Sequence, residues 1–105
     1  MSYSKFHHAA WYGDVVGVEE CLAAGMDVNL KEEDRTPLYC ACSQNRTEVV
    51  RVLLSAGADP NIAYNYGYTP LHWAATYGNI EVARLLVAHG ATVSKNGYTP
   101  LHRAC

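Results

Sequence analysis

A short motif recurs three times along this chain of 105 residues, and its spacing constrains the fold more than any other feature. Thr36-Pro37-Leu38-Tyr39 returns as Thr69-Pro70-Leu71-His72 and again as Thr99-Pro100-Leu101-His102, at intervals of 33 and 30 residues. In the first two copies a glycine follows eighteen residues after the motif, at Gly57 and Gly90. Such a period is typical of repeat proteins, in which each unit buries its apolar face against its neighbours.

An earlier, degenerate copy opens the chain. Phe6-His7-His8-Ala9-Ala10 matches Leu71-His72-Trp73-Ala74-Ala75, with Ser4-Lys5 in place of Thr-Pro, and Gly25 again lies eighteen residues after the matching histidine. We therefore expect one repeat domain over residues 1–105. Its repeats cover approximately residues 1–30, 31–63, 64–94 and, incompletely, 95–105.

Each copy predicts two helices and an extended connection. Threonine is a good N-cap, and proline at the first helical position loses only an N–H that has no helical partner. Gly13, Gly78 and the equivalent Asn45 lie where a helix ends in a left-handed residue. Apolar residues at helical spacing then indicate a second helix, closed by Gly25, Gly57 or Gly90. The predicted helices are 5–12, 15–24, 37–44, 47–56, 70–77, 80–89 and a partial helix from about residue 100.

The runs Gly67–Ala75, Gly78-Asn79 and Leu53–Asn61 carry a resemblance to the ankyrin repeat family. The resemblance implies an all-α repeat solenoid, in which helix–turn–helix pairs are joined by β-hairpin or loop fingers. It also implies a protein–protein interaction module that binds a partner protein on the concave face made by the fingers and first helices. We expect an adaptor, targeting or regulatory domain of a larger intracellular protein.

By the layout of the family, a set of residues ends the first helices or lies at the finger tips, where tyrosine and tryptophan favour recognition. The candidate partner-binding residues are Trp11, Tyr12, Glu32, Glu33, Arg35, Ser43, Gln44, Asn65, Tyr66, Tyr68, Thr76, Tyr77, Lys95 and Tyr98. The finger of the second repeat is acidic at Glu32, Glu33 and Asp34, whereas the finger of the third repeat is neutral and rich in tyrosine. A partner with an apolar or aromatic centre and a basic flank would complement both. We expect Trp73 to lie in the core between repeats.

Several positions depart from the family pattern. Asp34 and Asn45 replace family glycines, and both residue types tolerate left-handed geometry. Glu20 replaces an apolar residue, which predicts a solvent-facing N-terminal end. Thr99 lies nine residues after Gly90, whereas Thr69 lies twelve residues after Gly57, which predicts that the third finger, the connection after Gly90, is stunted. Because the chain stops inside the fourth repeat, we expect a fragment of a longer protein, or an end that another copy covers by self-assembly.

Composition excludes several classes of function. Eight lysines and arginines against ten aspartates and glutamates give a net charge of −2 without a basic run, so nucleic acid is not the expected partner. No apolar stretch is long enough for a membrane span, and the N-terminus lacks a secretory signal. Four irregularly spaced cysteines indicate a reduced, intracellular protein of the cytoplasm or nucleus rather than a disulfide scaffold.

No residue set predicts catalysis, a cofactor or a metal site, and an enzyme or metal protein is the weaker alternative. His7, His72 and His102 occupy one position of successive repeats, where the resemblance implies a hydrogen bond to the Thr-Pro turn. Cys40 and Cys42 lack the spacing of a zinc or redox pair. In the family, asparagines matching Asn29 and Asn61 can be hydroxylated, although a structural role in the turn is favoured.

Overall fold

The computed structural model of the chain describes residues 4–63 and 67–91. This part contains α1 (Lys5–Tyr12), α2 (Val15–Ala23), α3 (Pro37–Ser43), α4 (Thr47–Ser55), α5 (Pro70–Thr76) and α6 (Ile80–Ala88). Every helix begins at its predicted residue. The five after α1 end one residue earlier than predicted, since that last residue caps the helix. The partial helix expected from residue 100 lies outside the described residues.

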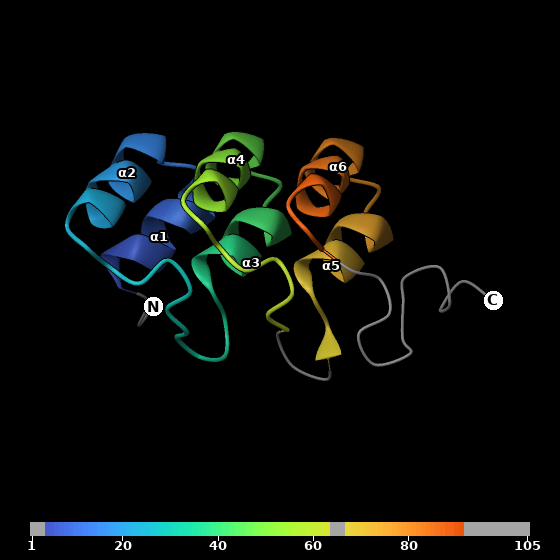
Figure 1. Ribbon diagram of the computed structural model, residues 1–105, viewed down its shortest axis with the longest axis horizontal. Coiled ribbons are helices and arrows are strands. Elements are labelled where there is room, and N and C mark those ends of the chain that lie inside the picture. The colour runs from blue at the N-terminus through green and yellow to red at the C-terminus, as the bar shows by residue number, and fades with distance from the viewer. Residues whose placement is uncertain (1–3, 64–66, 92–105) are drawn as a thin grey trace.

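The helices form two parallel rows (Figure 1). The first helices α1, α3 and α5 make one row, and the second helices α2, α4 and α6 make the other. Each helix packs on its partner in the same repeat and on its counterpart in the neighbouring repeat. This arrangement confirms the all-α repeat solenoid, in which interactions between adjacent repeats replace a single central core.

Apolar side chains between repeats hold the stack together. Phe6, Leu38, Leu53 and Leu86 are almost fully buried. In the row of first helices, small residues such as Ala41 are buried and allow the helices to approach closely.

Local signals set the helix ends as the sequence predicts. The Oγ1 of Thr36 accepts a hydrogen bond from the backbone N–H of Tyr39 at 3.1 Å, and Thr69 caps α5 in the same way. Gly13, Asn45 and Gly78 have φ values of 75°, 55° and 69°, in the left-handed region expected of residues that end a helix.

The N-terminal end of the stack carries an exposed ion pair. Glu20 is exposed, and its Oε1 lies 3.8 Å from the Nζ of Lys5. This confirms the expectation that a charge at this apolar position of the repeat faces solvent. The third finger, expected to be stunted, lies outside the described residues.

Candidate partner-binding surface

An aromatic cluster surrounds Trp73 on α5. Its ring centroid lies 4.9 Å from that of Tyr77, 5.6 Å from Tyr39 in the preceding repeat and 6.2 Å from Tyr68. The indole is half-buried, so the prediction that Trp73 belongs to the core is wrong in part. It packs between repeats against Tyr39 but keeps another side open to a groove.

Tyr68 precedes α5 and contacts two side chains of that helix. Its ring stacks on His72 with centroids 5.3 Å apart, and its hydroxyl lies 3.0 Å from the Oγ1 of Thr76. His72 is itself held at the start of α5, because its Nδ1 accepts a hydrogen bond from the backbone N–H of Thr69 at 3.1 Å. These contacts orient the ring of Tyr68, and with it the ring of Trp73, in the unbound protein.

A shallow groove of about 280 Å³ lies between the ends of α3 and α5. Its walls come from two adjacent repeats, at the point where each first helix turns into its second helix. The lining residues are Ser43, Gln44, Asn45, Trp73, Tyr77 and Asn79. We call this surface the α3/α5 groove.

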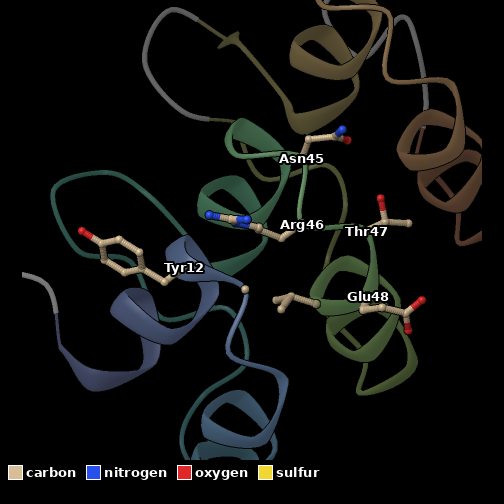
Figure 2. A pocket seen from close by; sticks show the side chains of 7 residues that line it. Tyr12, Asn45, Arg46, Thr47 and Glu48 are labelled. Atoms are coloured by element: carbon tan, nitrogen blue, oxygen red, sulfur yellow. The ribbon is translucent and has the colours of Figure 1, made fainter.

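A second groove, of about 290 Å³, lies one repeat earlier and is lined by Tyr12, Gly13 and residues 45–49 (Figure 2). Arg46 reaches across it to the end of α1, where its Nε donates a hydrogen bond to the carbonyl of Trp11 at 3.1 Å. A cation at this end complements the negative pole of the helix. We call this surface the α1/α3 groove; unlike its neighbour, it contains charged side chains, those of Arg46 and Glu48.

The finger of the second repeat, between Gly25 and Thr36, turns tightly at its tip. Glu32 and Arg35 exchange two backbone hydrogen bonds of 2.9 Å, and the two residues between them have positive φ, 54° at Glu33 and 64° at Asp34. Positive φ at both central residues is the geometry of a two-residue hairpin turn. The left-handed geometry expected of Asp34 is confirmed, and the turn presents the Glu33 carboxylate to solvent, 3.7 Å from the guanidinium of Arg35.

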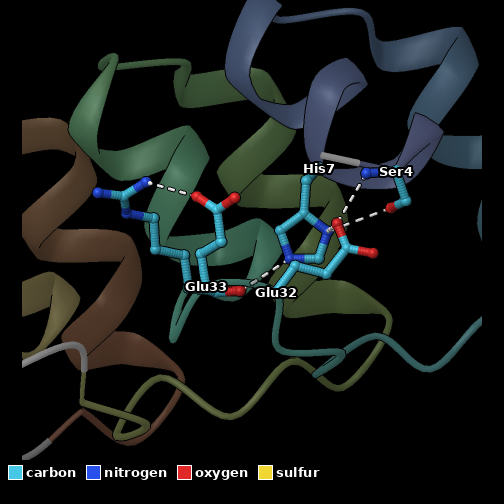
Figure 3. A network of polar contacts seen from close by, with 5 residues as sticks. Ser4, His7, Glu32 and Glu33 are labelled. Carbon is cyan, nitrogen blue, oxygen red and sulfur yellow. Dashed lines mark hydrogen bonds and ion pairs between the residues drawn. The ribbon is translucent and has the colours of Figure 1, made fainter. Parts of the chain in front are cut away.

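His7 ties this finger to the first repeat (Figure 3). The imidazole is fully buried, and its Nε2 lies 2.8 Å from the carbonyl oxygen of Arg35, which can only accept. Its Nδ1 lies 3.3 Å from Oε1 of Glu32, which also accepts the backbone N–H of Ser4 at 2.7 Å. The predicted structural role of this histidine is confirmed at His7 and His72; His102 lies outside the described residues.

The structure divides the candidate residues into two groups. Trp11, Tyr12, Ser43, Gln44, Thr76 and Tyr77 lie at the ends of the first helices, whereas Glu32, Glu33, Arg35 and Tyr68 lie in the fingers. Of the helix-end group, Tyr12 and Tyr77 are 57% and 61% exposed. Tyr68 joins the two groups through Thr76. Asn65, Tyr66, Lys95 and Tyr98 lie outside the described residues.

Sequence reasoning missed three residues that line the α3/α5 groove: Trp73, Asn45 and Asn79. A signal for Trp73 was present, because residues four apart on a helix share one face and Tyr77 was already a candidate. Asn45 and Asn79 come from different repeats, and only the stacking of repeats brings them to one groove.

The two finger asparagines connect successive repeats. The Oδ1 of Asn29 accepts the backbone N–H of Asp59 at 2.8 Å, and the Nδ2 of Asn61 donates to the carbonyl of Gly90 at 3.1 Å. Each asparagine also has its own N–H bonded to the aspartate two residues before it. These contacts support the structural role that was favoured for Asn29 and Asn61.

The cysteines of the described residues behave as small apolar side chains. Cys21, Cys40 and Cys42 are buried, and burial, together with the nearby Cys40, raises the pKa of the Cys42 thiol. Nowhere in residues 4–63 and 67–91 do three or more histidine, cysteine, aspartate or glutamate side chains group as metal ligands would. Within the same residues, every helix is too short or too polar to cross a membrane.

Comparison with known proteins identifies a family. The model of the ankyrin repeats, described as three copies, matches residues 3–64 and 57–105. The ankyrin repeat and KH domain-containing protein mask-1 of Caenorhabditis elegans is 43% identical over 53 residues, which are 50% of this chain and 2% of that protein. The palmitoyltransferase AKR1 of Kluyveromyces lactis is 40% identical over 67 residues, 62% of this chain and 9% of that protein.

A longer match joins the chain to an enzyme of Arabidopsis thaliana, the serine/threonine-protein kinase 12. The two are 36% identical over 91 residues, which are 86% of this chain and 19% of the kinase. The chain thus spans less than a fifth of the length of each of these three relatives. The similarity to the two enzymes is confined to their repeat part.

Proposed function

The chain belongs to the ankyrin repeat family, whose repeats are generally protein–protein interaction modules, and we propose that it binds a partner protein through the face made by its first helices and fingers. Ankyrin repeat domains are generally non-catalytic. We further propose a single domain over residues 1–105 that acts as an adaptor, targeting or regulatory part of a larger intracellular protein.

The fixed aromatic cluster on α5 carries this proposal. Tyr77 is 61% exposed, and the neighbouring Trp73 is half-buried and held by three other rings. Exposed aromatic side chains that are already oriented bind a partner without a large loss of side-chain entropy. The acidic tip of the second repeat's finger, Glu32 to Asp34, would attract a basic flank of the partner and speed association.

Alanine variants of the two grooves test the proposal. The triple variant Tyr12→Ala, Gln44→Ala and Tyr77→Ala removes the side chain at the same position of each repeat, including two exposed tyrosines. In affinity capture from a cell lysate, we expect a specific partner to be retained by the unmodified chain and to be lost, by about tenfold or more, from this variant, because recognition aromatics are energetic hot spots. Captured proteins are quantified by mass spectrometry.

The control variant carries alanine substitutions in the row of second helices. Glu19 and Arg51 occupy one exposed position of α2 and α4, so Glu19→Ala with Arg51→Ala alters the second helices. We expect this double variant to retain the partner, and circular dichroism should show both variants folded. Loss of the partner from the α2/α4 variant, with retention by the groove variant, would contradict the proposed binding face.

A second candidate function is self-assembly, favoured by the outer face of α6. Ile80 and Val87 are 65% and 55% exposed, and with Ala83, Ala88 and the side chain of Arg84 they line a largely apolar surface. The equivalent face of α4 buries Val50 and Leu54, because α6 packs on that helix. The opposite end of the stack carries the Lys5–Glu20 ion pair, so we propose that two copies pair through their α6 faces and close as a dimer.

Mass measurements over a range of concentrations test self-assembly. We expect sedimentation equilibrium to show a monomer–dimer equilibrium, and Val87→Arg to shift it to monomer, because a second cation beside Arg84 would be buried without an acidic partner on this surface. Val16→Arg is the matched control, since Val16 is 63% exposed on α2 at the other end. A chain that stays monomeric at every concentration would exclude this candidate.

A further inference from the structure

We propose that the α3/α5 groove binds a proline-containing segment of the partner in the polyproline II conformation. This inference rests on the proposed function, because it assigns a ligand class to one part of the proposed binding face.

The groove has a distinctive chemistry. None of its six lining side chains carries a charge: Ser43, Gln44, Asn45, Trp73, Tyr77 and Asn79. A phosphorylated or strongly charged segment would therefore lose its hydration without gaining an ionic partner there. The groove instead offers two aromatic side chains and three side-chain amides, each with two N–H donors and a carbonyl acceptor.

A polyproline II segment can bind to both the aromatic side chains and the side-chain amides of the groove. Its backbone has no internal hydrogen bonds, so its carbonyl oxygens point outward as acceptors for side-chain amides. Its proline rings are flat apolar surfaces that pack in grooves lined by aromatic residues. The groove volume of about 280 Å³ suits a short stretch of extended chain rather than a folded domain.

The groove and the proline-rich segment would both be ordered before they bind. Trp73 is in ring contact with Tyr39 and Tyr68, and the hydroxyl of Tyr68 is hydrogen-bonded at Thr76. A proline-rich segment likewise has little backbone freedom to lose. Binding between two pre-ordered surfaces avoids much of the entropy loss that weakens the association of short peptides.

The α1/α3 groove provides an internal comparison. Tyr12 is the counterpart of Tyr77 and is similarly exposed, but His8 replaces the tryptophan, with its ring 4.7 Å from that of Tyr12. Arg46 and Glu48 add charges to this groove. We therefore expect the proline segment to select the α3/α5 groove.

The test is a nitrogen-15 NMR titration of the whole chain with a capped decaproline peptide, and with a capped Gly-Ser decapeptide as the flexible control. The chain has two tryptophans, so the indole N–H signals of Trp11 and Trp73 report separately. We expect decaproline to shift the Trp73 indole and the side-chain amides of Gln44, Asn45 and Asn79. We expect the Trp11 indole to stay in place, and the Gly-Ser peptide to cause no shift.

Matched variants locate the site. Tyr77→Ala should weaken decaproline binding by about tenfold, whereas Tyr12→Ala should change it by less than about twofold, as expected of a hot-spot side chain and of one outside the site. The inference is overturned if millimolar decaproline leaves the Trp73 indole unmoved. It is also overturned if the Gly-Ser peptide acts equally, or if both variants lose binding alike.

Competition separates this inference from the proposed function. If a captured partner depends on Tyr77 but decaproline neither displaces it nor shifts Trp73, the binding face stands and the ligand class is wrong. If the triple alanine variant captures the partner as well as the unmodified chain does, while decaproline still shifts the Trp73 signal, then the groove binds proline. The proposed binding face is then wrong for that partner.

Discussion

Replacing Leu53 by alanine is expected to lower the free energy of unfolding by about 2–5 kcal/mol, the range for a large apolar side chain removed from a packed interior. Leu53 is fully buried in α4, the second helix of the central repeat, and α4 packs on both α2 and α6. The cavity would thus weaken a helix on which both of its neighbours depend. Urea unfolding followed by circular dichroism measures the change.

Two further variants define the cause of that loss. Leu53→Met keeps the volume of the side chain and should cost less than about 1.5 kcal/mol. Leu86→Ala makes the same deletion in α6, which packs on α4 and α5, so comparing it with Leu53→Ala tests whether the central position matters more. A Leu53→Ala protein within about 0.5 kcal/mol of the unmodified chain would contradict the packing of the repeats described above.

The helices were predictable because their signals are local. A Thr-Pro pair caps a helix through atoms within three residues of one another, and a left-handed glycine or asparagine ends it. Because the Thr-Pro-Leu motif recurs at a nearly constant interval, equivalent helices of successive repeats could be aligned from the sequence. The left-handed Glu33 was not predictable in this way, because its geometry follows from the pairing of Glu32 with Arg35 across the turn.

The candidate surface was predictable only in part. The family layout placed Tyr77 and Thr76 at the end of a first helix, which the bounds of α5 bear out. The groove beside them depends on contacts between residues about one repeat apart, such as Tyr39 with Trp73. The burial of Trp73 depends on contacts with the neighbouring repeat rather than on α5 itself. A sequence pattern within one repeat therefore could not predict that part of the indole is exposed.

Replacing His7 by alanine is expected to destabilise the domain by about 2–4 kcal/mol, since an unsatisfied buried polar partner and a cavity act together. The imidazole is fully buried and joins the start of α1 to the finger of the second repeat, through the Arg35 carbonyl and the Glu32 carboxylate. Its loss should also open the finger, so the backbone amides of Glu32 and Arg35, which pair across the turn, should exchange with deuterium faster.

The adjacent histidine is the control for this prediction. His8 lies on the exposed side of α1, so His8→Ala should change the free energy of unfolding by less than about 0.5 kcal/mol. Because His8→Ala removes the same side chain one residue away, any difference between the variants reflects burial and the finger contacts rather than helix propensity. Equal stability of the two variants, with unchanged exchange at Arg35, would show that the His7 contacts do not hold the finger. If instead only His7→Ala loosens the finger, then the acidic tip, one edge of the proposed binding face, owes its position to a side chain of the preceding repeat.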